Sequence, residues 1–366
     1  MSNTYDDALQ LLAETGPEYG EGSANDGPIV AAYLVAMEQP QAVLPWVKAY
    51  RTRLEHLPPP GTAITRNSWR GALGDWSRVG DWVPFFQREL NQASWQRVVG
   101  DWAPRLAPGL SGASGHALIR TAVALDHLNH EDSELRRDEL AQSLAYWASR
   151  YLKLPGILGS SAAGKLAPSE ALERVKWQHK DRPPQLKNLS AGLQKLVGFP
   201  SFAGVINLVL IPKEPVALIS QITEAMARVY LANSHMPEKL LPFIHAVTVP
   251  AAIRHVIPHV RPDQVVPLVR YGWQFAGAMY AIYGRANPVE QWDHPRADRA
   301  ELITRAIAGG NEHAILFTGT CLEEFDESGS PVYLAAAADA MERLTAPISE
   351  TGDESEAYPG QGDAAG

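Results

Sequence analysis

Histidines recur at the ends of predicted apolar helices in this 366-residue chain. His245 lies in the apolar stretch LLPFIHAVTVPAAIRHVIPHV, where we expect a first helix to end and a second to begin near Thr248 and Pro250. A single buried histidine is usually an ordinary core residue. Several at helix ends indicate a shared site, because neutral imidazole is the commonest protein ligand for iron, copper and zinc.

A second histidine opens the stretch GNEHAILFTGTCLEEF, Gly310 to Phe325. Asn311 is a good N-cap, and apolar residues follow with helical spacing, so a helix is predicted from about Glu312. His313 then lies in its first turn. Leu316 is three residues later on the same face, so a group bound by His313 would also meet a hydrocarbon side chain.

A third histidine begins a mixed stripe on the helix predicted after Ser114-Gly115. His116, Arg120, Val123 and His127 are spaced to share one helical face. Imidazole and guanidinium together are unusual for a plain core. We therefore count Arg120 with the three histidines as a candidate catalytic residue, which would hold a phenolate or carboxylate of a substrate or else pair with an acid of the protein.

The elements that must position these side chains are predicted to be α-helices. Apolar residues recur at three-and-four spacing in most of the chain, with Pro and Gly between the segments. We expect an all-α, large single-domain, bundle-like fold over residues 1–348, with a long irregular connection around 154–200 and an acidic disordered tail at 349–366. The predicted helices cover 5–15, 28–37, 42–54, 82–91, 116–128, 136–151, 218–231, 237–247, 263–283 and 298–308.

Composition excludes some classes of function. The formal charge is −9, and the chain has no block of Lys and Arg, so nucleic acid is not expected as a partner.

Cys321, the only cysteine, is expected to be a small core residue in a reducing compartment. The N-terminus lacks a signal-peptide pattern, and the apolar run at 205–212 is too short to span a bilayer, so a cytoplasmic protein without membrane contact is predicted. The oligomeric state is not predicted.

Long stretches of the chain resemble the questin oxidase-like family, a group of α-helical proteins associated with oxidative tailoring of polyketides and anthraquinones. The resemblance implies an oxidoreductase that performs oxygenation, Baeyer–Villiger-type oxidation or ring cleavage on an aromatic or polycyclic small molecule. It is carried by ALQLLAETGPEYG, GPIVAAYLVAM, VLPWVKAYRTRLE, WRGALGDWSRVGDWVPFFQREL, APRLAPGLSGASGHALIRTAVAL, ELAQSLAYWASRYLKLP, FIHAVTVPAAIRHVIPHV and GNEHAILFTGTCLEEF.

The resemblance also implies a non-haem iron held by histidines and, in some members, by a carboxylated lysine. His116, His245 and His313 fall on histidines of the family pattern. Three positions depart from it: Asp26 and Val123 stand where histidines are expected, and Leu316 stands where the lysine is expected.

Two kinds of chemistry remain open. His116, His245 and His313 with the carboxylate of Asp26 suit Fe(II) or another divalent metal, with positions left for dioxygen or substrate and with NADPH as a candidate reductant. Alternatively, the departures have removed the metal. The histidines would then act as acid–base groups in a non-oxidative cyclisation, dehydration or rearrangement, or the pocket would bind a ligand without turnover.

Overall fold

A computed structural model of the chain describes residues 4–159, 164–178, 189–284, 286–291 and 298–344. The fold is all-α, as predicted, apart from a two-stranded antiparallel hairpin of β1 (Glu18–Tyr19) and β2 (Ser23–Ala24). The α-helices are α1 (Thr4–Leu12), α2 (Gly27–Ala36), α3 (Pro40–Arg51), α4 (Trp69–Ala72), α5 (Val79–Gln92), α6 (Trp95–Leu106), α7 (His116–His130), α8 (Glu134–Ser149), α9 (Pro168–Leu172), α10 (Leu189–Lys195), α11 (Ala217–Asn233), α12 (Leu240–Val256), α13 (Pro262–Tyr283), α14 (Arg299–Gly309), α15 (Glu312–Ser328) and α16 (Val332–Leu344).

Short 3₁₀ turns connect or extend several of these helices. They are η1 (Trp76–Arg78), η2 (Ala107–Gly109), η3 (Gly112–Gly115), η4 (Leu196–Gly198), η5 (Pro200–Phe202), η6 (Val205–Asn207), η7 (Pro237–Lys239) and η8 (Ile257–His259).

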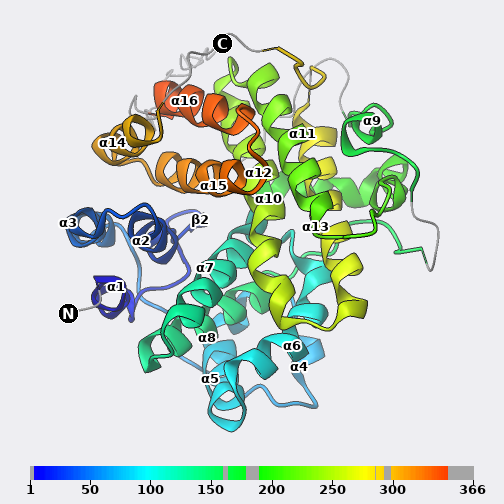
Figure 1. The fold of residues 1–366 in the computed structure, drawn as a ribbon. Coiled ribbons are helices and arrows are strands. Elements are labelled where there is room, and N and C mark those ends of the chain that lie inside the picture. Colours follow the sequence, from blue (N-terminus) through cyan, green and yellow to red (C-terminus); the bar gives the residue numbers. More distant parts are fainter. Residues whose placement is uncertain (1–3, 160–163, 179–188, 285, 292–297, 345–366) are drawn as a thin grey trace, which may run out of the picture.

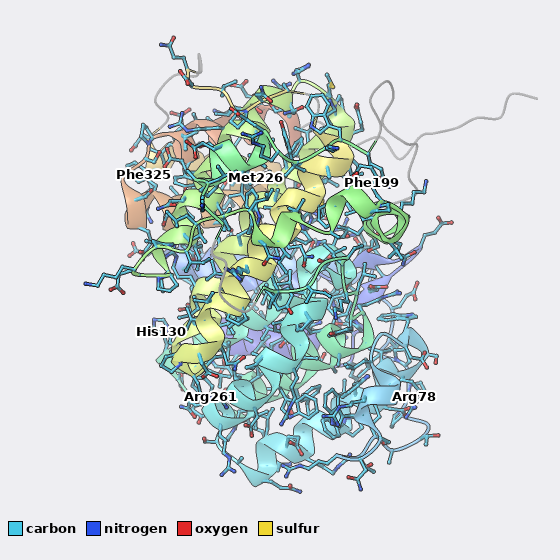
Figure 2. The ribbon with its side chains drawn as sticks, turned by 90° about the vertical axis from the view of Figure 1, so that its right-hand side faces the viewer. Arg78, His130, Phe199, Met226, Arg261 and Phe325 are labelled. Carbon is cyan, nitrogen blue, oxygen red and sulfur yellow. The ribbon has the colours of Figure 1, made fainter. Side chains whose placement is uncertain are left out.

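Helix α12 lies at the centre of the fold. It packs against α11, α13, α7 and α15, and Figure 1 shows it between the helices α14–α16 on one side and α13 on the other. In the orthogonal view α13 begins beside Arg261 and crosses the face of the molecule (Figure 2). The segment that carries His245 is thus enclosed by helices from both halves of the chain.

The expected helix break near Thr248 and Pro250 is wrong. Helix α12 is continuous from Leu240 to Val256, with Pro250 inside it. Proline removes one backbone hydrogen bond and usually ends or kinks a helix. Here nearly every residue of the helix is buried against neighbouring helices, and this tertiary packing keeps the chain helical through the proline.

Within the described residues, one helix is long and apolar enough to cross a membrane. It covers Pro237–His259, with a mean hydropathy of 1.5 in its most apolar window, and 78% of that window is buried inside the protein. A bent pair, Leu189–Gly198 with Pro200–Asn207, passes the same test only if it is taken as one span. Core helices of soluble proteins also pass this test, so the finding is compatible with a soluble protein, and the cytoplasmic location stays a prediction.

The connection predicted around 154–200 contains only short helical pieces in its described parts, α9 and α10 with the turns η4 and η5; residues 160–163 and 179–188 lie outside the described residues. The apolar run at 205–212 begins with η6, and its Val209 forms an isolated parallel bridge with Leu166. Residues 349–366, the predicted acidic tail, also lie outside the described residues. The single-domain organisation stays a prediction.

Candidate metal centre

A strained turn places His116 at the first position of α7. The two residues Ala113 and Ser114 have positive φ angles of 48° and 54°, and Gly115 follows with φ 90°. Left-handed backbone costs a non-glycine residue about 1–2 kcal/mol. At Gly115 a side chain is also excluded, because a Cβ atom would lie 2.2 Å from the Val249 side chain on α12. The turn therefore brings the start of α7 directly against α12.

The same turn fixes the orientation of the His116 ring. Nδ1 lies 2.8 Å from the backbone carbonyl of Ala113, and since a carbonyl oxygen can only accept, Nδ1 carries the hydrogen. In the neutral ring Nε2 then presents a lone pair. Nε2 is buried and has no hydrogen-bond partner among the described residues. This is the arrangement in which a histidine ligates a metal through Nε2 and is oriented through Nδ1.

Asp26 faces the histidines from the beginning of α2. It occupies the N-cap position, but its side chain makes no capping hydrogen bond. The side chain of Asn25 accepts from the Gly27 amide instead (3.0 Å), and Pro28 has no amide hydrogen to satisfy. Asn25 is itself held by bonds from its Nδ2 to Thr15 Oγ1 and the Gly16 carbonyl (3.0 and 2.8 Å). Asp26 is thereby free to point into the protein.

His245 enters from the middle of α12 and His313 from the second position of α15. His245 is fully buried, whereas the His313 side chain keeps 17% of its surface exposed. Burial lowers the pKa of His245 well below its ordinary value, and the neighbouring His116 and His313 lower it further. The pKa of His313 is lowered by burial too, while Asp26 opposes that shift. Both rings are therefore neutral near pH 7, the form that binds metals.

The three histidines converge. Each offers one ring nitrogen, and these three atoms lie within 4.8 Å of one another. The ring centroids are 4.4 Å apart for His116 and His245, 5.7 Å for His245 and His313, and 6.0 Å for His116 and His313. Asp26 adds a carboxylate whose oxygens lie 3.6 Å from His116 Nε2 and 3.9 Å from His313 Nε2.

The polar atoms at this point fit a bound cation. Asp26 Oδ1, His116 Nε2 and both ring nitrogens of His245 are buried without a hydrogen-bond partner among the described residues. A contact of His245 with the Ser114 backbone raises its pKa but does not meet hydrogen-bond geometry. Each unsatisfied buried group costs about 1–3 kcal/mol. A divalent metal would satisfy three of them, Asp26 Oδ1, His116 Nε2 and one nitrogen of His245, because imidazole and carboxylate are suitable ligands.

Three helix N-termini meet at this centre, because Asp26 stands at the N-cap position of α2, His116 opens α7 and His313 lies in the first turn of α15. Each helix N-terminus carries the equivalent of about half a positive charge. This potential favours anions at the centre and offsets part of the cost of burying Asp26. Burial still raises the pKa of Asp26, while His116 and His313 lower it.

A charged and aromatic rim borders the exposed edge of His313. Glu312 forms an ion pair with Arg53 at 3.4 Å, and the Arg53 guanidinium lies 4.3 Å from the centre of the Tyr50 ring. The Tyr50 hydroxyl accepts a hydrogen bond from the Asp26 amide at 2.9 Å. Tyr19 packs edge-on against Tyr50 with ring centroids 6.2 Å apart. These contacts connect the rim directly to the backbone that carries Asp26.

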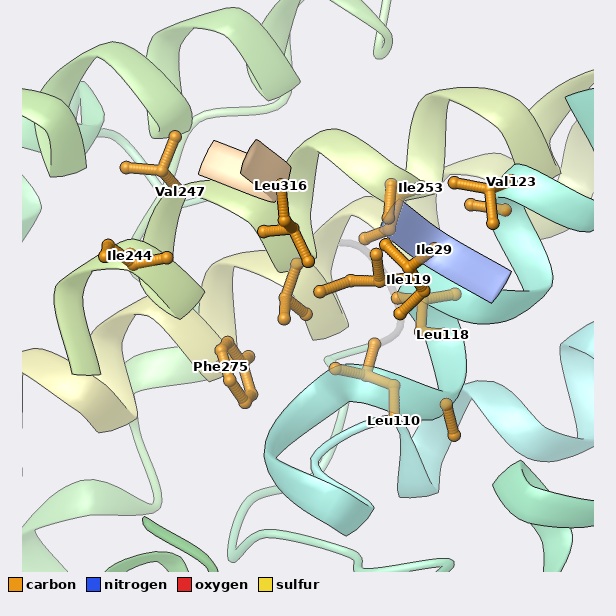
Figure 3. Close-up of a cluster of buried hydrophobic side chains, with 14 of the residues drawn as sticks. Ile29, Leu110, Leu118, Ile119, Val123, Ile244, Val247, Ile253, Phe275 and Leu316 are labelled. Atoms are coloured by element: carbon orange, nitrogen blue, oxygen red, sulfur yellow. The ribbon is translucent and has the colours of Figure 1, made fainter. Parts of the chain in front are cut away.

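Val123 and Leu316, the other two departures from the family pattern, belong to the hydrophobic core. Leu316 is completely buried and Val123 is 7% exposed. Figure 3 shows Leu316 among apolar side chains that include Ile119 and Ile253. The hydrocarbon that was expected beside His313 is therefore packed into the core.

Arg120 does not join the three histidines. Its guanidinium forms a two-pronged ion pair with Glu139 on α8 (2.5 and 2.7 Å) and bonds to Gln142 (3.3 Å), and it is 1% exposed. Of the two roles considered for it, pairing with an acid is the one seen. Its Nη1 has no partner among the described residues, and its charge contributes only weakly to lowering the pKa of Asp26.

Two other histidines lie apart from the candidate metal centre. His127 is stacked on Tyr5, with ring centroids 3.8 Å apart, and burial lowers its pKa to about 4. His255 lies between Asp126 and Glu323, which raise its pKa to about 10 against the effect of burial. Both make contacts typical of structural histidines.

A comparison with protein families matches residues 32–317 to the questin oxidase-like family. The chain belongs to the questin oxidase-like family. Membership indicates an oxidase-type enzyme of secondary metabolism. His116, His245 and His313 all lie inside the matched segment, whereas Asp26 precedes it. No individual curated protein matches the chain.

Sequence reasoning missed the residues that position the centre. Asn25, Tyr50 and Arg53 were not singled out, although they orient Asp26 or border His313. The sequence held one usable signal, Asn25-Asp26-Gly27-Pro28, in which two good N-cap residues precede a helix-starting proline. Only one of two adjacent residues can cap, so the other is available for a different role.

Proposed function

We propose that this member of the questin oxidase-like family is an oxygenase or oxidase that acts on an aromatic or polycyclic polyketide-like small molecule. In this proposal His116, His245 and His313 hold a divalent transition metal, Fe(II) in the first place, and Asp26 supplies the carboxylate. The observation that supports it most directly is the convergence of three histidine ring nitrogens within 4.8 Å of one another beside the buried Asp26, whose Oδ1 has no hydrogen-bond partner among the described residues.

Each proposed ligand has a defined role. The His116 ring is fixed by the Ala113 carbonyl, so its Nε2 lone pair is pre-oriented. His245 closes the centre from the core side and excludes water, because it is fully buried. His313 and Asp26 form the wall nearer to solvent. When bound, iron would supply the reaction with dioxygen at the coordination positions that the protein leaves open.

The rim indicates the kind of substrate. An aromatic molecule that approaches the exposed edge of His313 would meet the rings of Tyr19 and Tyr50 and the guanidinium of Arg53. Arg53 is 46% exposed and its ion pair with Glu312 is long, so the pair can open at small cost. A phenolate or carboxylate on the substrate would then replace Glu312 as the partner of Arg53.

Oxygenation with insertion of one oxygen atom requires two further electrons, and NADPH is the proposed donor. Ring cleavage that incorporates both oxygen atoms would need no external reductant. Oxygen and NADPH consumption, measured per substrate converted, therefore distinguish the two outcomes.

A metal-free reaction is the second candidate, and the packing of Val123 and Leu316 in the core supports it. At these two positions the family pattern has candidate metal ligands, whereas this chain has apolar side chains. In that case the neutral His313 beside Asp26 would serve as a general base and acid for a cyclisation, dehydration or rearrangement. Ligand binding without turnover would use the same surroundings.

Metal content separates the candidates. Protein purified without a histidine tag is expected to contain close to one equivalent of iron or another transition metal, and His245→Leu is expected to contain none. His245→Leu should keep the melting temperature of the metal-free protein or raise it, because it replaces two unsatisfied buried nitrogens with hydrocarbon. Metal-free wild-type protein that converts substrate equally well without oxygen would contradict the oxidase proposal and favour acid–base chemistry.

A further inference from the structure

A cavity of about 500 Å³ lies between α4, the end of α5 and α6. These helices lie at the opposite end of the molecule from α14 and α16 (Figure 1), and none of them carries a residue of the candidate metal centre. The charged residues that line the cavity are four arginines, Arg66, Arg70, Arg97 and Arg105, and two acids, Glu89 and Asp101.

The positions of the charges follow from the helix repeat. Arg97, Asp101 and Arg105 are spaced by four residues on α6 and therefore share one face. The floor of the cavity is aromatic, with Trp69 at 8% and Trp102 at 1% exposure. The Arg70 guanidinium lies 4.4 Å from the Trp69 ring centre and that of Arg105 lies 4.9 Å from the Trp102 ring centre. These cation–π contacts hold two guanidinium groups at the cavity wall.

Only one of the four arginines has an acidic partner. Arg66 binds both oxygens of Glu89 (2.8 and 3.1 Å), and Glu89 also accepts from the Trp102 indole (3.2 Å). Within the described part of the chain, Arg70, Arg97 and Arg105 form no ion pair within 4.0 Å. Four arginines against two acids leave the lining with an excess of two positive charges.

A local excess of positive charge is unusual in a protein whose net charge is negative. The chain carries 41 acidic and 32 basic residues, so a surface arginine has abundant carboxylates with which to pair. Like charges gathered in one hollow repel one another unless an anion compensates them. Arginine is also the side chain whose planar, forked donors best match an oxyanion.

We propose that this cavity binds a small oxyanion ligand that carries at least two negative charges, of the phosphate type, at a site separate from the candidate metal centre. The excess of two charges fits a phosphate dianion or a pyrophosphate group. The Arg66–Glu89–Trp102 contacts form part of the lining, and Arg97 and Arg105 supply donors that form no ion pair within the described residues. A free phosphate compound and the phosphates of a nucleotide share this chemistry.

Calorimetric titration of the full chain tests the proposal at low ionic strength with pyrophosphate, inorganic phosphate and ADP as separate probes. We expect one site per chain for pyrophosphate. The double variant Arg97→Gln/Arg105→Gln should weaken it by about tenfold or more, the loss expected for even one charge-assisted hydrogen bond. Equal affinity for ADP would identify a nucleotide-type ligand, and preference for pyrophosphate a free phosphate compound.

The matched control is Arg299→Gln/Arg305→Gln on α14, which removes the same charge from exposed residues elsewhere. An equal loss in this control would show that only net charge matters and would overturn the proposal. Absence of binding by the wild type at millimolar pyrophosphate would overturn it as well. Tighter binding of a single-stranded 12-nucleotide DNA that depends on the same two arginines would replace the small ligand with a nucleic acid.

Discussion

Replacing Leu316 by lysine tests whether this position has been packed into the core or still faces a metal. Leu316 is fully buried in a helix, and its core cluster includes Ile119 and Ile253. Lysine and leucine have similar helix propensities, and the lysine stem keeps much of the apolar contact. The main cost is therefore that of burying an ammonium group among apolar side chains.

The magnitude follows from the pKa change of a buried lysine. Lysines in such surroundings have a pKa of about 6, compared with about 10.4 in the unfolded chain. At pH 7 the buried lysine is largely neutral, so the cost is set by the roughly 3.4 units between pH 7 and the unfolded pKa, and at about 1.4 kcal/mol per unit the fold loses about 4–5 kcal/mol. The cost is largest below the folded pKa and disappears above the unfolded pKa, so at pH 9.5 it falls to about 1 kcal/mol.

The assay is urea unfolding of Leu316→Lys at pH 7 and pH 9.5, with iron content measured after incubation with Fe(II) and bicarbonate. Leu316→Met is the control, because a swap that conserves volume costs less than about 1.5 kcal/mol. We expect the lysine variant to lose stability and gain no iron. A retained stability at pH 7 together with a bicarbonate-dependent gain of iron would refute the reasoning, because the lysine would then reach the metal and act as a carboxylated ligand.

Two further predictions concern ion pairs outside the candidate metal centre. Asp126 and Glu323 raise the pKa of His255 from 6.5 to about 10. The stabilisation that they provide is therefore complete below pH 6.5 and is lost as the pH rises towards 10. The full shift would correspond to a free energy of unfolding of about 5 kcal/mol, but both acids are more than a third exposed, so solvent screening reduces the expected contribution to about 1–2 kcal/mol. Chemical unfolding between pH 6 and 10 should show this loss in the wild type and not in His255→Gln, and parallel curves would contradict it. Arg120→Met should cost about 3–5 kcal/mol by stranding Glu139, and adding Glu139→Leu should recover most of the loss. If activity stays lost in that stable double variant, Arg120 has a role with the substrate beyond its ion pair.

Most of the long helices were predictable because each depends on its own apolar spacing, but α6 and α16 were not among the predicted segments. The predicted segment 263–283 corresponds to α13 (Pro262–Tyr283) and 116–128 to α7 (His116–His130), with differences at the ends of the size that caps and fraying produce. The prediction failed at Pro250, where the local rule favours a break. The contacts that keep α12 helical there come from α7, α11 and α13, and local sequence does not report them.

The candidate site was predictable in its residue types and not in its details. His116, His245 and His313 were expected together, and the structure brings their ring nitrogens within 4.8 Å. Arg120 shares a helical face with His116, but even side chains one turn apart on the same face can contact different partners. The pairing of Arg120 with Glu139 depends on how α7 packs on α8, which the spacing along α7 does not determine.

The departures from the family pattern are consistent with a metal site of unchanged ligand charge. A carboxylated lysine would bring one negative oxygen ligand to the metal, and Leu316 brings none. Asp26, in place of a histidine, would bring a negative oxygen ligand from α2, where its oxygens lie 3.6 Å from His116 and 3.9 Å from His313. If a metal is bound, the count of anionic ligands is therefore conserved while their positions change. Asp26→Asn should then weaken metal binding more than Asp26→Glu does, whereas equal effects of the two changes would show that the charge at this position does not matter.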